Sequence, residues 1–128
     1  MATFRQVSQI ALSLPNASER DARGARQWRV KDKLFVWERP LRPRELESLG
    51  DSAPRGPILA ARVEHLHAKE ALLASEPDLY FTTYHFDGYP AVLARLDLLE
   101  AAALRELIIE AWLARAPARL VQAYLAGG

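Results

Sequence analysis

Two pairs of strand-like segments, each joined by a short polar turn, constrain the fold more than any other feature of the sequence. In the first pair, ARQWRV and KLFVWERP meet around the turn at 31–33; in the second, LYFTTYH and YPAVLARL meet at Asp87-Gly88. Runs rich in β-branched and aromatic residues predict antiparallel hairpins. Asp-Gly strengthens the second prediction because hairpin turns need a positive φ, which Gly adopts freely and Asp tolerates.

Helical patterns surround these hairpins. Apolar residues recur at helical spacing after Thr3, which together with Gln6 fits a capping box. Further helices are predicted in EHLHAKEALLASEP, in EAAALRELIIEAWLARAP and after Pro117, and ILAARV is predicted to be a short strand. The proline-rich connection after Arg42 has room for one helical turn at 44–49. We therefore expect a two-layer α+β fold in the order α-β-β-β-α-β-β-α-α, with an antiparallel sheet of about five strands and helices on one face.

The composition is that of one globular domain spanning residues 1–128. The chain has no cysteine, which excludes thiolate metal sites, iron–sulfur clusters and thiol redox chemistry. No apolar run approaches the roughly 18 residues that a membrane-spanning helix needs. Because no positively charged start leads into an apolar stretch, we expect a cytoplasmic protein with no membrane partner.

Positive charge is concentrated in the first half of the chain. Residues 1–62 have a balance of +5 and residues 63–128 one of −4. Such a field either attracts phosphates or acidic partners, or is a solvated face that the acidic half balances after folding. The basic residues that would contact phosphates are Arg26, Arg29, Lys31, Lys33, Arg39, Arg42 and Arg44. Trp28 and Trp37 would then stack on bases, but we favour the alternative that both are core residues.

Strand alternation around Asp87-Gly88 predicts a second surface. With a two-residue turn, Phe86 pairs with Tyr89 and Phe81 lies opposite Ala94, and side chains alternate between the two faces. The face towards the helices then carries Leu79, Phe81, Val92, Ala94 and Leu96. The opposite face carries Tyr80, Tyr84, Phe86, Tyr89 and Arg95. This aromatic face is typical of cross-strand pairing, of a dimer or protein interface, or of a stacking surface for a ligand.

Residues suited to catalysis or metal binding are sparse. His65 and His67 are two positions apart, a spacing that separates them on a helix, and no His-x-x-x-His pair is present. His85 and Asp87 flank a turn tip, where neither would be desolvated for acid–base chemistry. The sequence has no nucleophile elbow, P-loop or dinucleotide-binding glycine motif. We therefore expect no enzyme activity, no cofactor and no metal.

Three segments carry a family resemblance over nearly the whole chain. RQWRVKDKLFVWERPLR, YHFDGYPAVLARL and EAWLARAPARLVQAYL, together with the order of elements, resemble the MmcQ/YjbR family of small bacterial proteins. The resemblance implies a two-layer α+β fold similar to secretion chaperones, with the hairpins forming a double wing. It also implies DNA binding, the usual label of the family, and it brings no catalytic motif. The connection between the second and third predicted strands is longer here than in the shorter members.

Two functional hypotheses follow. In the first, the protein is a non-enzymatic DNA-binding protein whose basic hairpin makes sequence-independent, salt-dependent phosphate contacts. In the second, it is a protein-interaction module or homodimer that uses the aromatic face. A sequence pI near 8.1 is low for a nucleic-acid-binding domain and counts against the first hypothesis.

Overall fold

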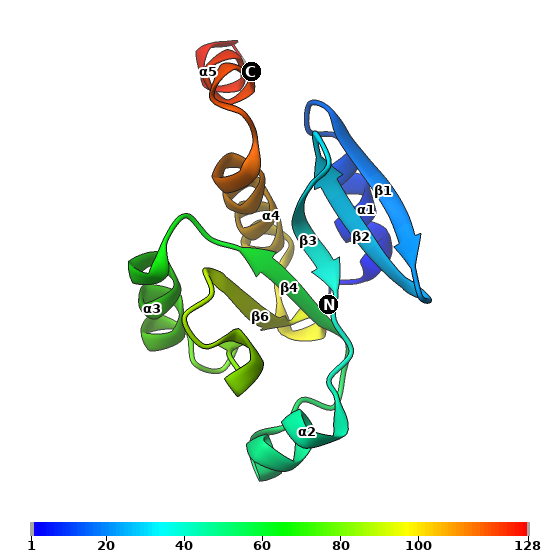
Figure 1. The fold of residues 1–128 in the computed structure, drawn as a ribbon, viewed down its shortest axis with the longest axis vertical. Helices are drawn as coiled ribbons and strands as arrows, with labels where there is room; N and C mark the ends of the chain where they lie inside the picture. The colour runs from blue at the N-terminus through cyan, green and yellow to red at the C-terminus, as the bar shows by residue number, and fades with distance from the viewer. Residues whose placement is uncertain (1, 128) are drawn as a thin grey trace.

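The structure, a computed structural model that describes residues 2–127, contains one six-stranded antiparallel sheet and five α-helices among those residues (Figure 1). The strands lie in the order β1-β2-β3-β4-β6-β5. Their bounds are β1 Ala17–Ala22, β2 Ala25–Val30, β3 Lys33–Glu38, β4 Ile58–Arg62, β5 Tyr80–Phe81 and β6 Ala91–Arg95. The helices are α1 Phe4–Leu12, α2 Pro43–Leu49, α3 Leu66–Ser75, α4 Ala101–Arg115 and α5 Ala118–Gly127. The predicted α+β class is confirmed.

Local sequence signals account for several boundaries. The Thr3 side chain accepts a hydrogen bond from Gln6 N, and the Gln6 side chain accepts one from Thr3 N, so the predicted capping box starts α1. The β2–β3 hairpin closes through Lys31 and Asp32, whose φ angles of 49° and 67° are those of a type I′ turn. The right-handed twist of the flanking strands fits this turn type, which fixes the hairpin register.

The main core lies between the sheet and the helices α1 and α4, which are seen behind the sheet in Figure 1. Trp28 of β2 and Trp112 of α4 are fully buried there. Each indole nitrogen has a hydrogen-bond partner, Glu19 for Trp28 and the carbonyl of Pro15 for Trp112. Helix α3 lies beside the β5–β6 edge, and α5 packs Tyr124 against Trp112 with ring centroids 5.1 Å apart. Burying the two largest apolar side chains under the helices defines the inner face of the sheet.

The opposite face of the sheet, here called the outer face, has its own smaller core. It is covered by the segment 82–90, which includes the 3₁₀ turn η2 (Tyr84–Phe86), and by apolar residues around α2. Buried residues of this core are Ile58, Ala60, Phe81, Phe86, Ala91 and Leu93, with Trp37, Leu41 and Leu49 packed against them. The β3–β4–β6 part of the sheet is therefore covered on both faces, whereas the outer faces of β1 and β2 are not.

The sheet has one more strand than the sequence predicts. Strand β1 lies in a segment for which the sequence predicts no strand, because its residues are Ala, Ser, Glu, Arg and Asp and favour turns over strands. It pairs along its whole length with β2, and the Glu19 carboxylate accepts hydrogen bonds from Ser8 and Trp28. Charged side chains are common on edge strands, where they discourage pairing with another chain.

The predicted hairpin at Asp87-Gly88 is wrong: a turn forms at these two residues, but the predicted strands do not pair next to it. Asp87 (φ −59°, ψ 130°) and Gly88 (φ 71°) form a turn of type II, closed by a 3.1 Å hydrogen bond from Tyr89 N to the Phe86 carbonyl. Type II turns do not match strand twist, and no ladder extends from this one. Instead β5 pairs with β6 across a longer loop, with Phe81 opposite Leu93 rather than Ala94.

The shifted register also corrects the predicted faces. Phe81 packs in the outer-face core, away from the helices α1 and α4, while Tyr80 packs in the main core. A one-residue change of register exchanges the two sides of a strand, so both residues move to the face opposite the expected one. Val92, Ala94 and Leu96 do contact the main core, as predicted.

Candidate nucleic-acid interface

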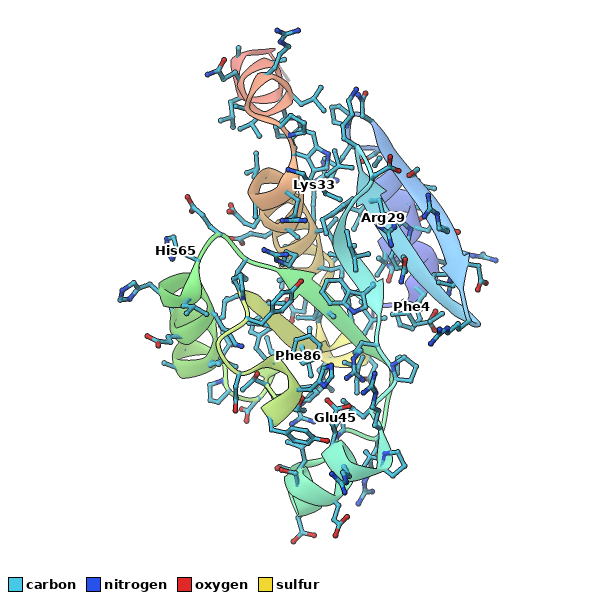
Figure 2. All side chains as sticks on the ribbon, in the orientation of Figure 1. Phe4, Arg29, Lys33, Glu45, His65 and Phe86 are labelled. Carbon is cyan, nitrogen blue, oxygen red and sulfur yellow. The ribbon has the colours of Figure 1, made fainter. Side chains whose placement is uncertain are left out.

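A shallow groove of about 290 Å³ lies on the outer face, between the first hairpin and the segment 82–90. We call it the outer groove, and the residues that line it are Gln27, Leu34, Trp37, Arg39, His85, Phe86 and Tyr89. Figure 2 shows Arg29 of β2 and Phe86 of η2 on either side of this region. The groove joins the two segments that the sequence singles out, although they are distant along the chain.

Phe86 is the centre of the aromatic side chains in the groove. Its ring centroid lies 6.5 Å from that of Trp37, 6.1 Å from that of Tyr89 and 5.7 Å from that of His85. Phe86 is buried, whereas Trp37 is half-buried and Tyr89 is 41% exposed. Trp37 and Tyr89 therefore present ring surface to a ligand, and Phe86 holds the cluster in place.

A buried lysine fixes the segment that carries these rings. Lys69 of α3 is 6% exposed, and its ammonium donates hydrogen bonds to the carbonyls of Phe86 (2.6 Å) and Tyr89 (2.9 Å). Burial lowers the pKa of Lys69, and the nearby charge of Asp87 opposes that shift. The two carbonyls hold one ammonium between them, so α3 and the turn at Asp87-Gly88 are joined directly.

A buried carboxylate fixes the same segment from the other side. Glu45 of α2 is fully buried and forms an ion pair of 3.0 Å with Arg39, and Thr83 donates a hydrogen bond to it (Figure 2). Burial alone would raise the pKa of Glu45. Hydrogen bonds from Thr83, Arg42 N and Arg39, together with the Arg39 charge, outweigh that effect and lower it. The Glu45 cluster thus ties α2, the end of β3 and the segment 82–90 together.

Two arginines outside the groove lining lie near Tyr89, and neither is among the predicted phosphate-binding residues. Arg62, at the end of β4, donates hydrogen bonds to the Tyr89 hydroxyl (3.1 Å) and the Pro90 carbonyl, and its guanidinium lies 4.9 Å from the Tyr89 ring centroid. Arg115, at the end of α4, has a buried Nε without a hydrogen-bond partner. Burial lowers the pKa of Arg115, as does the charge of Arg62, while Tyr89 acts in the opposite direction. Strand alternation from Ile58 could have placed Arg62 on the outer face, but no local signal marks Arg115.

Three of the seven predicted phosphate-binding residues lie on or beside the outer face. Arg29 projects from β2 and donates hydrogen bonds to the Asp32 carbonyl and the Gln27 side chain. Lys31 is exposed in the hairpin turn. Arg39 lines the groove with its guanidinium 5.2 Å from the Phe86 ring centroid, but its charge is neutralised by Glu45.

The other four lie elsewhere. Arg26 is on the inner side, where its guanidinium is 5.3 Å from the Phe4 ring centroid and 3.7 Å from the Glu38 carboxylate. Lys33 alternates with buried Phe35 and is also on the inner side. Arg42 and Arg44 are exposed at the start of α2. The basic segment therefore does not form one surface.

The predicted aromatic face is also divided. Phe86 and Tyr89 line the outer groove, and Tyr84 is 50% exposed in η2. Tyr80 is buried on the opposite face of the sheet. Arg95 stacks on Phe81 at 4.7 Å and donates a hydrogen bond to the Ser52 carbonyl, away from the groove. The structure brings together only two of the five residues and adds Trp37, which we expected in the core.

Comparison with known proteins identifies the family. The model of the YjbR family matches residues 12–114. The chain belongs to the YjbR family. It is 50% identical over 129 residues to the uncharacterized proteins Rv2570 of Mycobacterium tuberculosis and Mb2600 of Mycobacterium bovis, with 98% of each chain covered. The resemblance predicted from the three sequence segments is confirmed.

A solved YjbR-type structure supports the fold. The crystal structure of protein DR2400 of Deinococcus radiodurans, with a domain of the family DUF419, superimposes with a TM-score of 0.62. The match covers 88% of this chain and 78% of that one at 19% identity, so it bears on the fold alone. Among residues 2–127, no helix is long and apolar enough to cross a membrane, and no cluster of three potential metal ligands is present.

Proposed function

We propose that this YjbR protein binds nucleic acid without catalysing a reaction, and that the outer groove takes an unpaired base while the first hairpin contacts phosphates. The observation that carries the proposal is the exposed ring surface of the outer groove with arginines beside it: Arg29 contacts the lining residue Gln27, and Arg62 contacts the lining residue Tyr89. Single-stranded nucleic acid is bound by this combination, because bases stack on aromatic rings and cations neutralise the backbone. Both contributions are independent of sequence.

Trp37 and Tyr89 are the stacking residues of the proposal. Each is partly exposed, and each is held by packing on Phe86 or by the bond from Arg62, so little side-chain freedom is lost when a base binds. The groove is small and walled by the 82–90 segment, which suits one base better than the stacked edge of a duplex. Single strands are therefore expected to bind more tightly than duplexes.

Arg29, Lys31 and Arg62 are the phosphate-contacting residues. Arg29 and Lys31 come from the predicted basic hairpin, and Arg62 borders the groove at Tyr89. None of the three forms an ion pair within residues 2–127, so their charges are not neutralised inside the protein. Arg26 and Arg39 are excluded from this role, since Glu38 and Glu45 pair with them.

The test is fluorescence anisotropy with labelled oligothymidylate and a duplex of equal length, at about 50 and 200 mM salt. Affinity for the single strand should fall steeply between the two concentrations. Replacing Tyr89 with Ala should weaken binding by about tenfold, because stacking contributes roughly 1–3 kcal/mol per base. Quenching of Trp37 fluorescence should accompany binding, since Trp28 and Trp112 are fully buried.

Arg105→Ala is the matched control for Arg29→Ala. It removes the same charge from an exposed position on α4, a helix that packs on the inner face. The proposal requires Arg29→Ala to weaken binding and Arg105→Ala to leave it almost unchanged. Equal effects of both variants, or no binding at low salt, would contradict it.

A second candidate, self-association through the outer face, is favoured by the exposure of Tyr84 and Tyr89. In that case sedimentation should give a mass near twice 14.4 kDa, and Tyr84→Ala should return the monomer mass. A monomer at high protein concentration would exclude this candidate.

A further inference from the structure

A second cavity of about 280 Å³ lies between α3 and α4, with the end of β5 beneath it. We call it the α3–α4 cleft. Its floor is apolar and is formed mainly by Val63, Leu72, Leu79 and Leu107. It lies on the inner side of the sheet and shares neither Trp37 nor Tyr89 with the outer groove.

Tyr80 supplies one polar group to the cleft. The residue is 6% exposed and lines the cavity, and the fully buried, unpaired side-chain polar atoms among residues 2–127 are Nε of Arg29 and Nε of Arg115, so the Tyr80 hydroxyl meets the water of the cleft. A tyrosine hydroxyl at the end of an otherwise buried ring can exchange that water for a polar group of a ligand. The hydroxyl is therefore available to a ligand in the cleft.

Three carboxylates surround the mouth of the cleft. Glu76 follows α3, and Glu106 and Glu110 lie one turn apart on α4; all three are exposed and none forms an ion pair within the described residues. Burial raises the pKa of Tyr80, and the negative charges of Glu76 and Glu106 add to that shift.

One basic residue, Arg62, also contributes to the lining of the cleft. The Arg62 guanidinium, however, is bonded to Tyr89 and Pro90 on the outer face. The three carboxylates do not converge into a metal-ligand cluster among residues 2–127. An apolar floor, one hydrogen-bond acceptor and a ring of spread negative charge fit a cation larger than a metal ion.

We propose that the α3–α4 cleft binds an organic ammonium ion, with the apolar part of the ligand on Leu72 and Leu107 and the ammonium between the Tyr80 hydroxyl and the carboxylates of Glu106 and Glu110. The ammonium has three donors, which the phenol oxygen and the two carboxylates can accept. The ligand is either a free amine or the side chain of a lysine in another protein. The proposal does not depend on nucleic-acid binding at the outer groove.

The experiment is a calorimetric titration of the whole protein with 2-phenylethylammonium chloride, and with 2-phenylethanol as the neutral ligand of the same shape. The ammonium should bind and the alcohol should bind at least about fivefold more weakly, the ratio expected when exposed carboxylates supply the difference. Glu106→Gln with Glu110→Gln should remove most of this preference, and Tyr80→Phe should weaken binding without changing the circular dichroism spectrum. Glu47→Gln, an exposed carboxylate on α2, is the matched control and should have no effect.

Two further titrations identify the source of the ammonium. A short capped peptide with one lysine is compared with the same peptide carrying norleucine, and with the free amine. Tighter binding of the lysine peptide indicates a protein partner, and tighter binding of the free amine indicates a small molecule. Equal binding of the ammonium and the alcohol, no binding of any amine, or equal effects of the Glu106/Glu110 and Glu47 variants would overturn the proposal.

Discussion

The turns at Lys31-Asp32 and Asp87-Gly88 have similar positions between apolar segments, but they form different structures. The first contains no glycine and closes a two-residue hairpin in which Val30 pairs with Lys33. The second contains the stronger hairpin signal but forms a type II turn from which no strand ladder extends. The difference shows that a sequence can locate a turn without deciding whether strands extend from it.

The environment of each turn explains the difference. The Lys31-Asp32 turn is exposed and is held by strand twist, backbone preference and a hydrogen bond from Arg29 to the Asp32 carbonyl, with no buried side chain in it. Asp87-Gly88 is flanked by Phe86, which is buried in the outer-face core, and by carbonyls that bind Lys69. Burial of one ring and satisfaction of one buried ammonium outweigh the ladder hydrogen bonds that a hairpin would gain.

The largest expected effect is that of Phe86→Ala. Removing a buried aromatic side chain leaves a cavity, so we expect a loss of about 3–5 kcal/mol in the free energy of unfolding. Tyr84→Ala, in the same turn but half exposed, should cost less than about 1 kcal/mol. Urea denaturation of both variants measures the comparison, and equal losses would show that Phe86 does not hold the segment 82–90.

Glu45→Gln should have the next largest effect. It leaves Arg39 partly buried without its counter-charge, a loss of about 3 kcal/mol, whereas Glu47→Gln on the exposed side of α2 should be almost neutral. Because the pKa of Glu45 is below its ordinary value of 4.5 in the folded state, its contribution is complete above pH 4.5 and is lost as the pH falls through the lowered value. The stability difference between wild type and Glu45→Gln should therefore shrink in acid, as measured by urea denaturation at several pH values.

Lys69→Met should destabilise the protein by about 1–3 kcal/mol, because two buried carbonyls lose their donor. Burial lowers the pKa of Lys69 from 10.5, so the unfolded state binds more protons in the interval below that value. Wild-type stability should consequently rise with pH through this interval, relative to Lys69→Met. Parallel pH profiles of the two proteins would contradict the assignment. Hydrogen exchange should show faster opening of 82–90 in the variant than of 25–38.

The smallest effects are expected at the turns themselves, and they should have opposite signs. Asp32→Gly relieves a positive φ in the type I′ turn and should stabilise the first hairpin by up to about 1 kcal/mol. Gly88→Ala places a residue with a Cβ at a backbone φ of 71°, although no atom obstructs that Cβ, and should lower the free energy of unfolding by about 1 kcal/mol. Thermal unfolding measures both. A stabilising Gly88→Ala would show that the turn can change type.

Most of the elements can be predicted from local patterns, but the groove cannot. The capping box of α1, the strands β2 and β3 and the stripe of α4 follow from spacings within one element. The outer groove depends on the crossing from β3 to the segment 82–90, and no spacing along the chain relates Trp37 to Phe86. Strand β1 was missed because its stability comes from pairing with β2 and from Glu19, rather than from its own residue preferences.

The sequence by itself determined the α+β class, the family, the basic hairpin and the position of the turn at Asp87-Gly88, since each rests on residue type and short-range spacing. Only the tertiary structure decided which residues share a surface. Burial of Phe86, the ammonium of Lys69 and the ion pair of Glu45 with Arg39 fix the segment 82–90 over the sheet. These interactions join residues from α2, α3, η2 and the position that follows β3, and their free energy depends on distances that no local pattern encodes.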